Sequence, residues 1–291
     1  MKRREALALI AGAGAWPLAA RAQQTTKVAR VGHLAPHSPD ASLTRRVLNA
    51  FRQGLQDLGY IEGQNIAIEY RFAESKFDRL PGLAAELIRL QVDILVAGPT
   101  VAAIAAKNAT KTIPIVVHNV GDPVGLGLVA SLARPGGNVT GLAYSIGLQT
   151  IVKGLELFKD VVPDLHRVAV LSNPANPSQA LAVGDLEIAA RTLGVQLQQL
   201  EARDPDEFDS AFAAMAKERV AALFVVAEGL FARYAARLAD LALKNRVPSM
   251  YGLRENVEAG GLMSYGPDIA DQSRRAAAFV DKILRGANQV G

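Results

Sequence analysis

The chain has 291 residues, half of them hydrophobic and about a fifth charged, which is enough for one large or two medium-sized domains. It has no cysteine, which excludes disulfides, thiolate metal sites, a cysteine nucleophile and a lipidated-cysteine anchor. The formal net charge is +4, but no lysine or arginine block follows residue 22, so nothing indicates a nucleic-acid partner.

Residues 1–22 have the pattern of a secretory signal peptide. A basic stretch, MKRRE, precedes the apolar run ALALIAGAGAWPLAA, and an A-x-A-like cleavage site, ARA, ends at Ala22. The apolar run is too short for a good membrane span. Removal of residues 1–22 takes away four basic residues and one acidic residue, so the net charge falls from +4 to +1. We expect an exported, periplasmic protein, and the Arg3-Arg4 pair leaves both the Sec and the Tat route open.

From Lys27 onward, strand-like apolar runs alternate with amphipathic helical patterns. In the first half we expect strands at 27–34, 65–71, 92–98, 113–119 and 138–145. We expect helices between them at 43–59, 79–90 and 100–111, a short helix within 123–138 closed by a Pro-Gly-Gly turn, and a helix at 148–159. This alternation indicates a parallel sheet with helices on both faces.

The second half repeats this order. We expect strands at 167–173, 195–201, 221–229, 247–252 and 261–266, with helices at 178–193, 205–218, 232–245 and 268–286. The Pro-x-x-Pro corner at Pro36 and Pro39 recurs at Pro174 and Pro177.

The repeat predicts an α/β protein of two Rossmann-like lobes with parallel sheets, joined by crossings near 140–145 and 259–264. Residues 23–143 with 262–291 would form lobe 1, and 144–261 lobe 2. One continuous doubly wound domain is the alternative.

Ligands of open parallel sheets bind outside the carboxyl ends of the strands. The candidate ligand-binding residues at those ends and at the crossings are Ser38, Pro99, Thr100, Asp122, Tyr144, Asn173, Asn176, Glu228, Tyr251 and Tyr265. Ser, Thr and Asn equally suit helix caps, Asp122 equally suits a turn, and the tyrosines equally suit a packed lobe junction. Glu228 directly follows an apolar strand, so it meets either a cationic ligand group or solvent.

Catalytic and cofactor motifs are not found. There is no P-loop, HExxH or GxSxG pattern, and Gly125 and Gly127 lack the spacing of a dinucleotide site. The four histidines at positions 33, 37, 118 and 166 do not form a metal-binding spacing. We expect no metal, no cofactor and no enzymatic activity.

Several segments carry a family resemblance, among them AFRQGLQDLGYIEGQNIAIEYRFAE, EAGGLMSYG and, most specifically, GDPVGLGLVASLARPGGNVTG. They resemble the ABC-transporter substrate-binding proteins that include tryptophan- and tyrosine-binding members, over roughly 28–286. The resemblance implies a type I periplasmic binding protein, monomeric, whose lobes close about a hinge on a solute and deliver it to a membrane permease and its ATPase subunits. It implies ligand contacts at Ser38, Pro99, Thr100, Asp122, Asn173, Asn176 and Glu228.

Two positions depart from the family pattern. Relatives commonly have aspartate where this chain has Glu228. They also continue beyond the last helix, whereas this chain ends at Gly291, and we expect this shorter end to weaken closure of the lobes. We expect an amino-acid-like solute, with an aromatic side chain preferred. Two other classes stay open: an exported sensing module that passes its closed state to a receptor, and an exported α/β enzyme.

Overall fold

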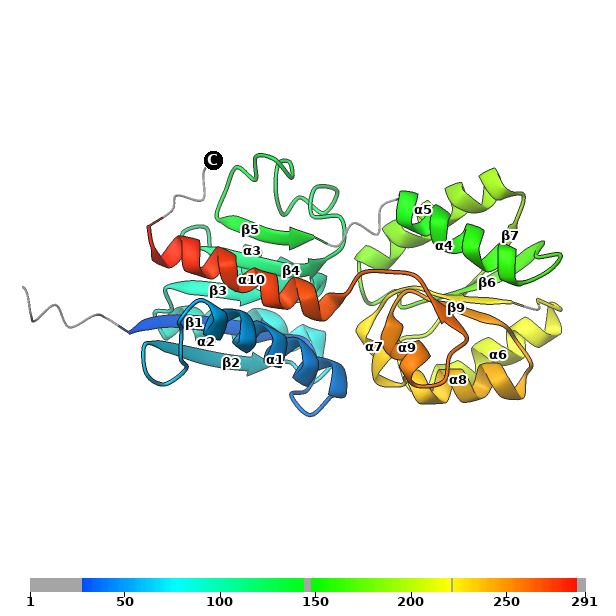
Figure 1. Cartoon of the computed structure of the whole chain (residues 1–291), viewed down its shortest axis with the longest axis horizontal. Helices are drawn as coiled ribbons and strands as arrows, with labels where there is room; N and C mark the ends of the chain where they lie inside the picture. The colour runs from blue at the N-terminus through cyan, green and yellow to red at the C-terminus, as the bar shows by residue number, and fades with distance from the viewer. Residues whose placement is uncertain (1–27, 144–147, 221, 287–291) are drawn as a thin grey trace, which may run out of the picture.

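The computed structural model describes residues 28–143, 148–220 and 222–286, which form two lobes side by side along the long axis of the molecule (Figure 1). Each lobe is built on one five-stranded sheet, and the strand pairings within both sheets are parallel. The predicted two-lobed α/β class is confirmed, and a single continuous sheet is excluded.

The first sheet has the strand order β2-β1-β3-β4-β5. Its strands are β1 (Ala29–Ala35), β2 (Ile66–Phe72), β3 (Ile94–Ala97), β4 (Ile115–Val120) and β5 (Val139–Ala143). The helices between them are α1 (Ser42–Asp57), α2 (Leu80–Arg89) and α3 (Thr100–Ala109), with a 3-10 turn at Phe77–Arg79.

The second sheet has the order β10-β9-β8-β6-β7. Its strands are β6 (Arg167–Ser172), β7 (Gln196–Glu201), β8 (Leu223–Val225), β9 (Ser249–Tyr251) and β10 (Met263–Ser264). Its helices are α4 (Leu148–Val161), α5 (Ser178–Leu193), α6 (Phe208–Lys217), α7 (Gly229–Arg233), α8 (Ala235–Lys244) and α9 (Arg254–Glu258), with a 3-10 turn at Pro205–Glu207. Counted from the start of each lobe, both sheets have the order 2-1-3-4-5, so β6 occupies the place of β1 and β8 that of β3.

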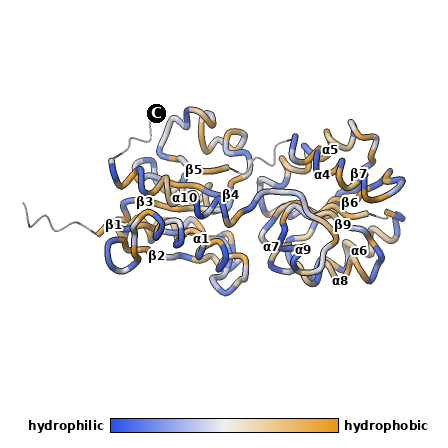
Figure 2. Tube along the Cα trace, in the orientation of Figure 1, coloured by the Kyte–Doolittle hydropathy of each residue, from blue (hydrophilic) through white to orange (hydrophobic). Residues whose placement is uncertain are grey.

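The central strands are apolar because both faces of each sheet are covered by helices. β3 and β4 are buried along their whole length, and Figure 2 shows hydrophobic residues along the strands. The covering helices bury one stripe each; in α1 this stripe contains Leu48, Phe51 and Leu55, spaced three and four residues apart.

The chain returns to the first lobe after β10. Met263 and Ser264 pair with β9, so these two residues belong to the second sheet, although the sequence assigned them to lobe 1. The last described helix, α10 (Ile269–Leu284), then lies along α1 on the first lobe, where Ala276, Ala277 and Val280 join its core (Figure 1). Two crossings therefore connect the lobes, one after β5 and one after β10.

One predicted helix is wrong. Residues 123–138 form turns instead, because Pro123, Gly125 and Gly127 disfavour helix and Gly127 has a positive φ of 65°. The short helix α9 lies where the sequence predicted none. Among the described helices, none is both long enough and apolar enough to cross a lipid bilayer.

Candidate functional site

A cavity of about 80 Å³ lies between the two lobes, several times the space of about 10–15 Å³ that one water needs. The first lobe contributes His33, Ala35, Pro36, His37, Ala41, Leu43, Thr44, Val47, Gly98, Pro99, His118 and Asn119, and Ile269 begins α10. The second lobe contributes Ala227, Glu228, Gly229, Arg233 and Leu253. Most of these walls are apolar, and both lobes are needed to enclose the space.

The topology explains why the cavity lies here. Most lining residues lie near the carboxyl ends of β1, β3 and β4 in the first lobe and of β8 and β9 in the second. In the first sheet β1 and β3 are adjacent, and the chain leaves them in opposite directions; β6 and β8 repeat this in the second sheet. Such a reversal of strand order opens a crevice at the strand ends, where α/β proteins bind ligands.

Glu228 is the acidic residue of the cavity wall. Its carboxylate caps α7 by accepting a hydrogen bond from the backbone N–H of Leu230, yet the residue is only 6% exposed. Burial raises the pKa of Glu228, and hydrogen bonds from Leu230, Asn173 and Asn176 oppose that rise. The carboxylate is therefore held in place by the protein while it borders the cavity.

The corner after β6 supports this carboxylate. Asn173 and Asn176 are buried, and each shapes the loop: Asn173 Oδ1 accepts from Ala175 N at 3.0 Å, and Asn176 Oδ1 accepts from Ser178 Oγ at 2.9 Å. Since both asparagines also hydrogen bond Glu228, the second Pro-x-x-Pro corner reaches the cavity through that residue. The first corner reaches it directly, because Pro36 lines it.

Two histidines lie on the first-lobe side of the cavity. The His33 and His118 rings are 6.0 Å apart between centroids, and both side chains are about 1% exposed. Burial lowers the pKa of His33 to about 3 and that of His118 to about 4, so both rings are neutral at pH 7. Gly98 makes room for the second ring, since a Cβ there would lie 2.8 Å from His118 Nε2.

A third histidine joins the lobes at the edge of the cavity. His37 Nδ1 lies 3.1 Å from Ser75 Oγ, and Arg233 of the second lobe donates to the same oxygen at 3.4 Å. Gly229 lets the ring approach, because a Cβ there would lie 2.2 Å from His37 Nε2. Burial, followed by the charge of Arg233, lowers the pKa of His37 to about 4.

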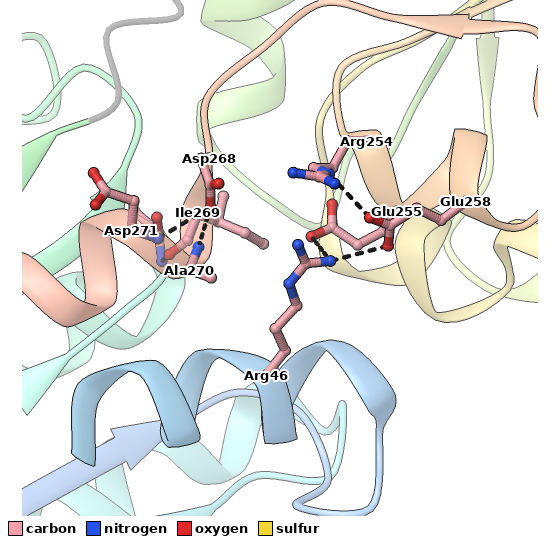
Figure 3. A network of polar contacts seen from close by, with 9 residues as sticks. Arg46, Arg254, Glu255, Glu258, Asp268, Ile269, Ala270 and Asp271 are labelled. Atoms are coloured by element: carbon pink, nitrogen blue, oxygen red, sulfur yellow. Dashed lines mark hydrogen bonds and ion pairs between the residues drawn. The ribbon is translucent and has the colours of Figure 1, made fainter. Parts of the chain in front are cut away.

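Ion pairs connect the lobes near the start of α10. Arg46 of α1 lies 3.0 Å from Glu258 and 3.3 Å from Glu255, both on α9 (Figure 3). Beside them, Leu43 and Val47 of α1 pack on Ala227, Ala232, Leu253 and Ile269. We call the contacts of Arg46 with Glu255 and Glu258 the inter-lobe latch.

Comparison with known proteins identifies the family. The family of ABC transporter substrate binding proteins matches residues 38–290, almost the whole of both lobes. The chain belongs to this family.

Individual relatives agree with this assignment. The tyrosine-binding protein of Clostridioides difficile is 28% identical over 81% of this chain and 67% of its own. A conserved domain protein of Vibrio cholerae superposes with a TM-score of 0.82 at 28% identity, covering 89% of this chain and 86% of its own. An ABC domain of Streptococcus pneumoniae in complex with L-Trp gives 0.83 at 23% identity, covering 90% and 86%. The fold is that of type I periplasmic binding proteins.

Two of the predicted site residues line the cavity of this substrate-binding protein, and two more contact one of them. Pro99 and Glu228 line it, and Asn173 and Asn176 hold Glu228. Asp122 is exposed at the end of β4, where its Oδ1 accepts from Gly125 N at 2.8 Å.

The other predicted residues that the structure describes do not line the cavity. Ser38 Oγ accepts from Asp40 N, and Thr100 is fully buried with its hydroxyl accepting from Gly121 N at 3.2 Å. Tyr251 is buried in the core of the second lobe, and Tyr265 is 41% exposed after β10. Tyr144 lies outside the described residues.

Residues 33–40 and 118–123 were among the strand-end stretches expected to face the ligand, but the histidines and Asn119 within them were not named as ligand contacts, and Arg233 lay outside them. A histidine within an apolar strand is as consistent with a packed core as with a ligand contact. The spacing of the four histidines bears only on metal binding and not on contacts with an organic solute. A usable signal was their position: His33 lies on β1 and His118 on β4, both near strand ends that face the crevice.

Proposed function

We propose that this chain is the periplasmic solute-binding component of an ABC importer, and that it captures an amino-acid-like, preferably aromatic, solute between its lobes. The observation that carries the proposal is the cavity between the lobes. Its wall contains His33 from the first lobe and Glu228 from the second. The loaded protein would deliver the solute to a membrane permease driven by ATPase subunits. Residues 1–22, the proposed export signal, lie outside the described part of the chain.

Closure of the lobes is the proposed mechanism. A solute that contacts both lobes gains all its contacts only when they are together, so it shifts the equilibrium toward the closed form. The latch and the apolar contacts of α1 act in the same direction, because they exist only while the lobes are together. No covalent step is needed, and we expect no turnover of the solute.

The acidic groups favour an ammonium group on the solute. Glu228 borders the cavity, and the charge of Asp122 contributes, after burial, to a raised pKa of Asp185 on α5 of the other lobe. A cationic group beside Glu228 would oppose the effect of burial on the pKa of that carboxyl. The name of the C. difficile relative, a tyrosine-binding protein, favours an aromatic amino acid.

A thermal-shift screen of amino acids and aromatic carboxylates tests this function. A solute at 100 times its Kd stabilises the folded protein by about 2.7 kcal/mol. We expect at least one amino acid to raise the Tm and Glu228→Gln to reduce the solute-induced rise. The matched control is Asp204→Asn, since Asp204 also caps a helical turn but lies outside the cavity wall. A screen in which no amino acid raises the Tm would contradict the proposed solute class.

Transport is tested in cells. Deleting the gene should reduce uptake of the labelled solute found in the screen, and the full-length chain should restore it. Normal uptake without the protein, together with solute binding in the screen, would favour the sensing module instead.

A further inference from the structure

Polar atoms without hydrogen-bond partners gather on the first-lobe wall of the cavity. They are both ring nitrogens of His33, Nε2 of His118 and Oδ1 of Asn119, each buried and without a partner among the described residues. All three residues line the same cavity. A buried polar atom left unpaired costs about 1–3 kcal/mol, so such atoms are rare unless something else pairs with them.

The neighbours of His118 determine which nitrogen carries its proton. Asn119 Nδ2 donates to the backbone carbonyl of Ile269 at 3.0 Å, which orients the amide, and the same Nδ2 lies 2.9 Å from His118 Nδ1. Nδ1 therefore accepts a hydrogen bond, and the proton of the neutral ring is on Nε2. Ser273 Oγ, 2.9 Å from the same Nδ1, is compatible with this tautomer. His118 thus presents an N–H donor, Asn119 Oδ1 presents an acceptor, and the neutral ring of His33 presents one donor and one acceptor.

This combination excludes the charged ends of an amino acid. An ammonium group has no lone pair, so it cannot accept from His118 Nε2. A carboxylate has no proton to donate, so it would leave both Asn119 Oδ1 and the acceptor nitrogen of His33 unpaired. Arg52, whose charge contributes to the low pKa of His33, is bound to Tyr70 at 2.9 Å and to Glu62 at 3.1 Å. Arg233 lies at the other side of the cavity, on Ser75.

A hydroxyl group fits better than a carbonyl. It can accept from His118 Nε2 and donate to His33 or to Asn119 Oδ1, whereas a carbonyl leaves both acceptors unpaired. Ala35, Val47 and Pro99, which line the same side of the cavity, are apolar. The group would therefore be carried on an apolar frame.

We propose that His33, His118 and Asn119 form a subsite for an uncharged hydroxyl group at the buried end of the solute. This inference rests on the proposed function, because it assumes a solute between the lobes. It adds the polar group that the solute must carry and the end at which it binds.

Two probe pairs that differ only in one hydroxyl test the subsite by calorimetry. L-tyrosine and L-phenylalanine share the charged groups of an amino acid, and p-cresol and toluene share an uncharged frame. In at least one pair we expect the hydroxyl compound to bind about tenfold tighter, the value of one well-made hydrogen bond. Equal affinities within both pairs, or no binding by any of the four probes, would overturn the subsite. Binding of other amino acids without hydroxyl preference would leave the proposed function standing.

Variants assign the preference to the histidine. His118→Phe keeps a ring but removes the donor, and we expect the preference to fall to about one, whereas His118→Gln retains an N–H donor and should keep part of it. His166→Phe, at an exposed position before β6, is the control. A preference unchanged in His118→Phe would overturn the proposal and would mean that the wall holds ordered water only. Because the wild-type comparison needs no variant, misfolding of one variant leaves the test decisive.

Discussion

At the scale of single residues, the cavity wall contains buried histidines in their neutral form and a buried glutamate with a raised pKa. His33 and His118 are neutral because burial disfavours the imidazolium, and burial likewise raises the pKa of Glu228. These groups lower the stability of the unliganded fold or make it depend on pH. We interpret this as the energetic cost of preparing polar atoms for a solute.

The histidines make stability depend on pH. Their folded pKa values, about 3 for His33 and about 4 for His118, lie below 6.5, so the unfolded chain binds protons that the folded chain does not. Their contribution to stability is complete above pH 6.5 and is lost as the pH falls toward 4, by about 1.4 kcal/mol per pH unit for each ring. We expect the urea midpoint to fall over this range.

The substitution His33→Phe should reduce the loss of stability per pH unit between pH 6.5 and 4 by the contribution of one histidine ring. His166→Phe, at an exposed position, should leave the slope as in the wild type. Identical slopes in the wild type and His33→Phe would show that His33 is not held neutral in the folded state.

Site residues could be predicted from the sequence where an unusual residue type followed a strand. Glu228 was predicted because a carboxylate directly after an apolar run is costly without a partner. His33 and His118 were missed because their role depends on which strands lie side by side, and that order is set by the tertiary fold. Asn119 was missed because its side-chain amide is oriented by a hydrogen bond to the backbone carbonyl of Ile269, at the start of α10 and 150 residues away.

At the scale of secondary structure, the position of α10 depends on a close approach to α1. Gly54 of α1 lies against the backbone of α10, where an added Cβ would be 2.2 Å from the carbonyl oxygen of Arg274. Tyr60 strengthens the contact by donating to Asp281 at 3.0 Å. Because α10 follows the second crossing, this packing anchors that crossing to the first lobe.

We therefore expect Gly54→Ala to lower the free energy of unfolding by about 2 kcal/mol or more, since the two helices must separate to admit the methyl group. The measurement is urea denaturation followed by circular dichroism. Gly184→Ala in α5 is the matched control: nothing lies within 4 Å of its Cβ, so this change should be neutral or stabilising by about 0.5–1 kcal/mol. Equal effects of the two substitutions would refute the close-packing account.

Most elements could be predicted from hydrophobic periodicity, because strand runs such as 92–98 and helical patterns such as 43–59 are long and regular. The exception, 123–138, has apolar residues at helical spacing, but its glycines and prolines favour turns. Strand ends near 261–266 were placed less well, since β10 has only two paired residues and its sheet is decided by its neighbour β9.

At the scale of the whole molecule, the two lobes are repeats of one topology that face each other across the cavity. Both sheets direct the carboxyl ends of their strands toward the cavity, so β1, β3 and β4 supply one wall and β8 and β9 the other. The latch joins the lobes through ion pairs, and the apolar contacts of Leu43 and Val47 lie beside it.

Breaking the latch should favour the open form. Arg46→Gln removes contacts with Glu255 and Glu258 that are partly exposed, so we expect a loss of about 0.5–1 kcal/mol of closure, seen as a two- to fivefold higher Kd by calorimetry. The control is Arg274→Gln, whose ion pair with Asp57 at 2.8 Å lies within the first lobe. Equal Kd values for the wild type and Arg46→Gln would show that the latch does not contribute to closure.

The central claim, that a solute is held by closing the two lobes on it, is tested most directly by an inter-lobe distance. Because the chain has no cysteine, spin labels can be placed at Leu132→Cys in the first lobe and Ile188→Cys in the second, both exposed positions. Double electron-electron resonance measures the distance between the two labels. With a saturating solute from the thermal screen, we expect the distance distribution to be shorter and narrower than that of the unliganded protein. An unchanged distribution with the solute demonstrably bound would contradict the account.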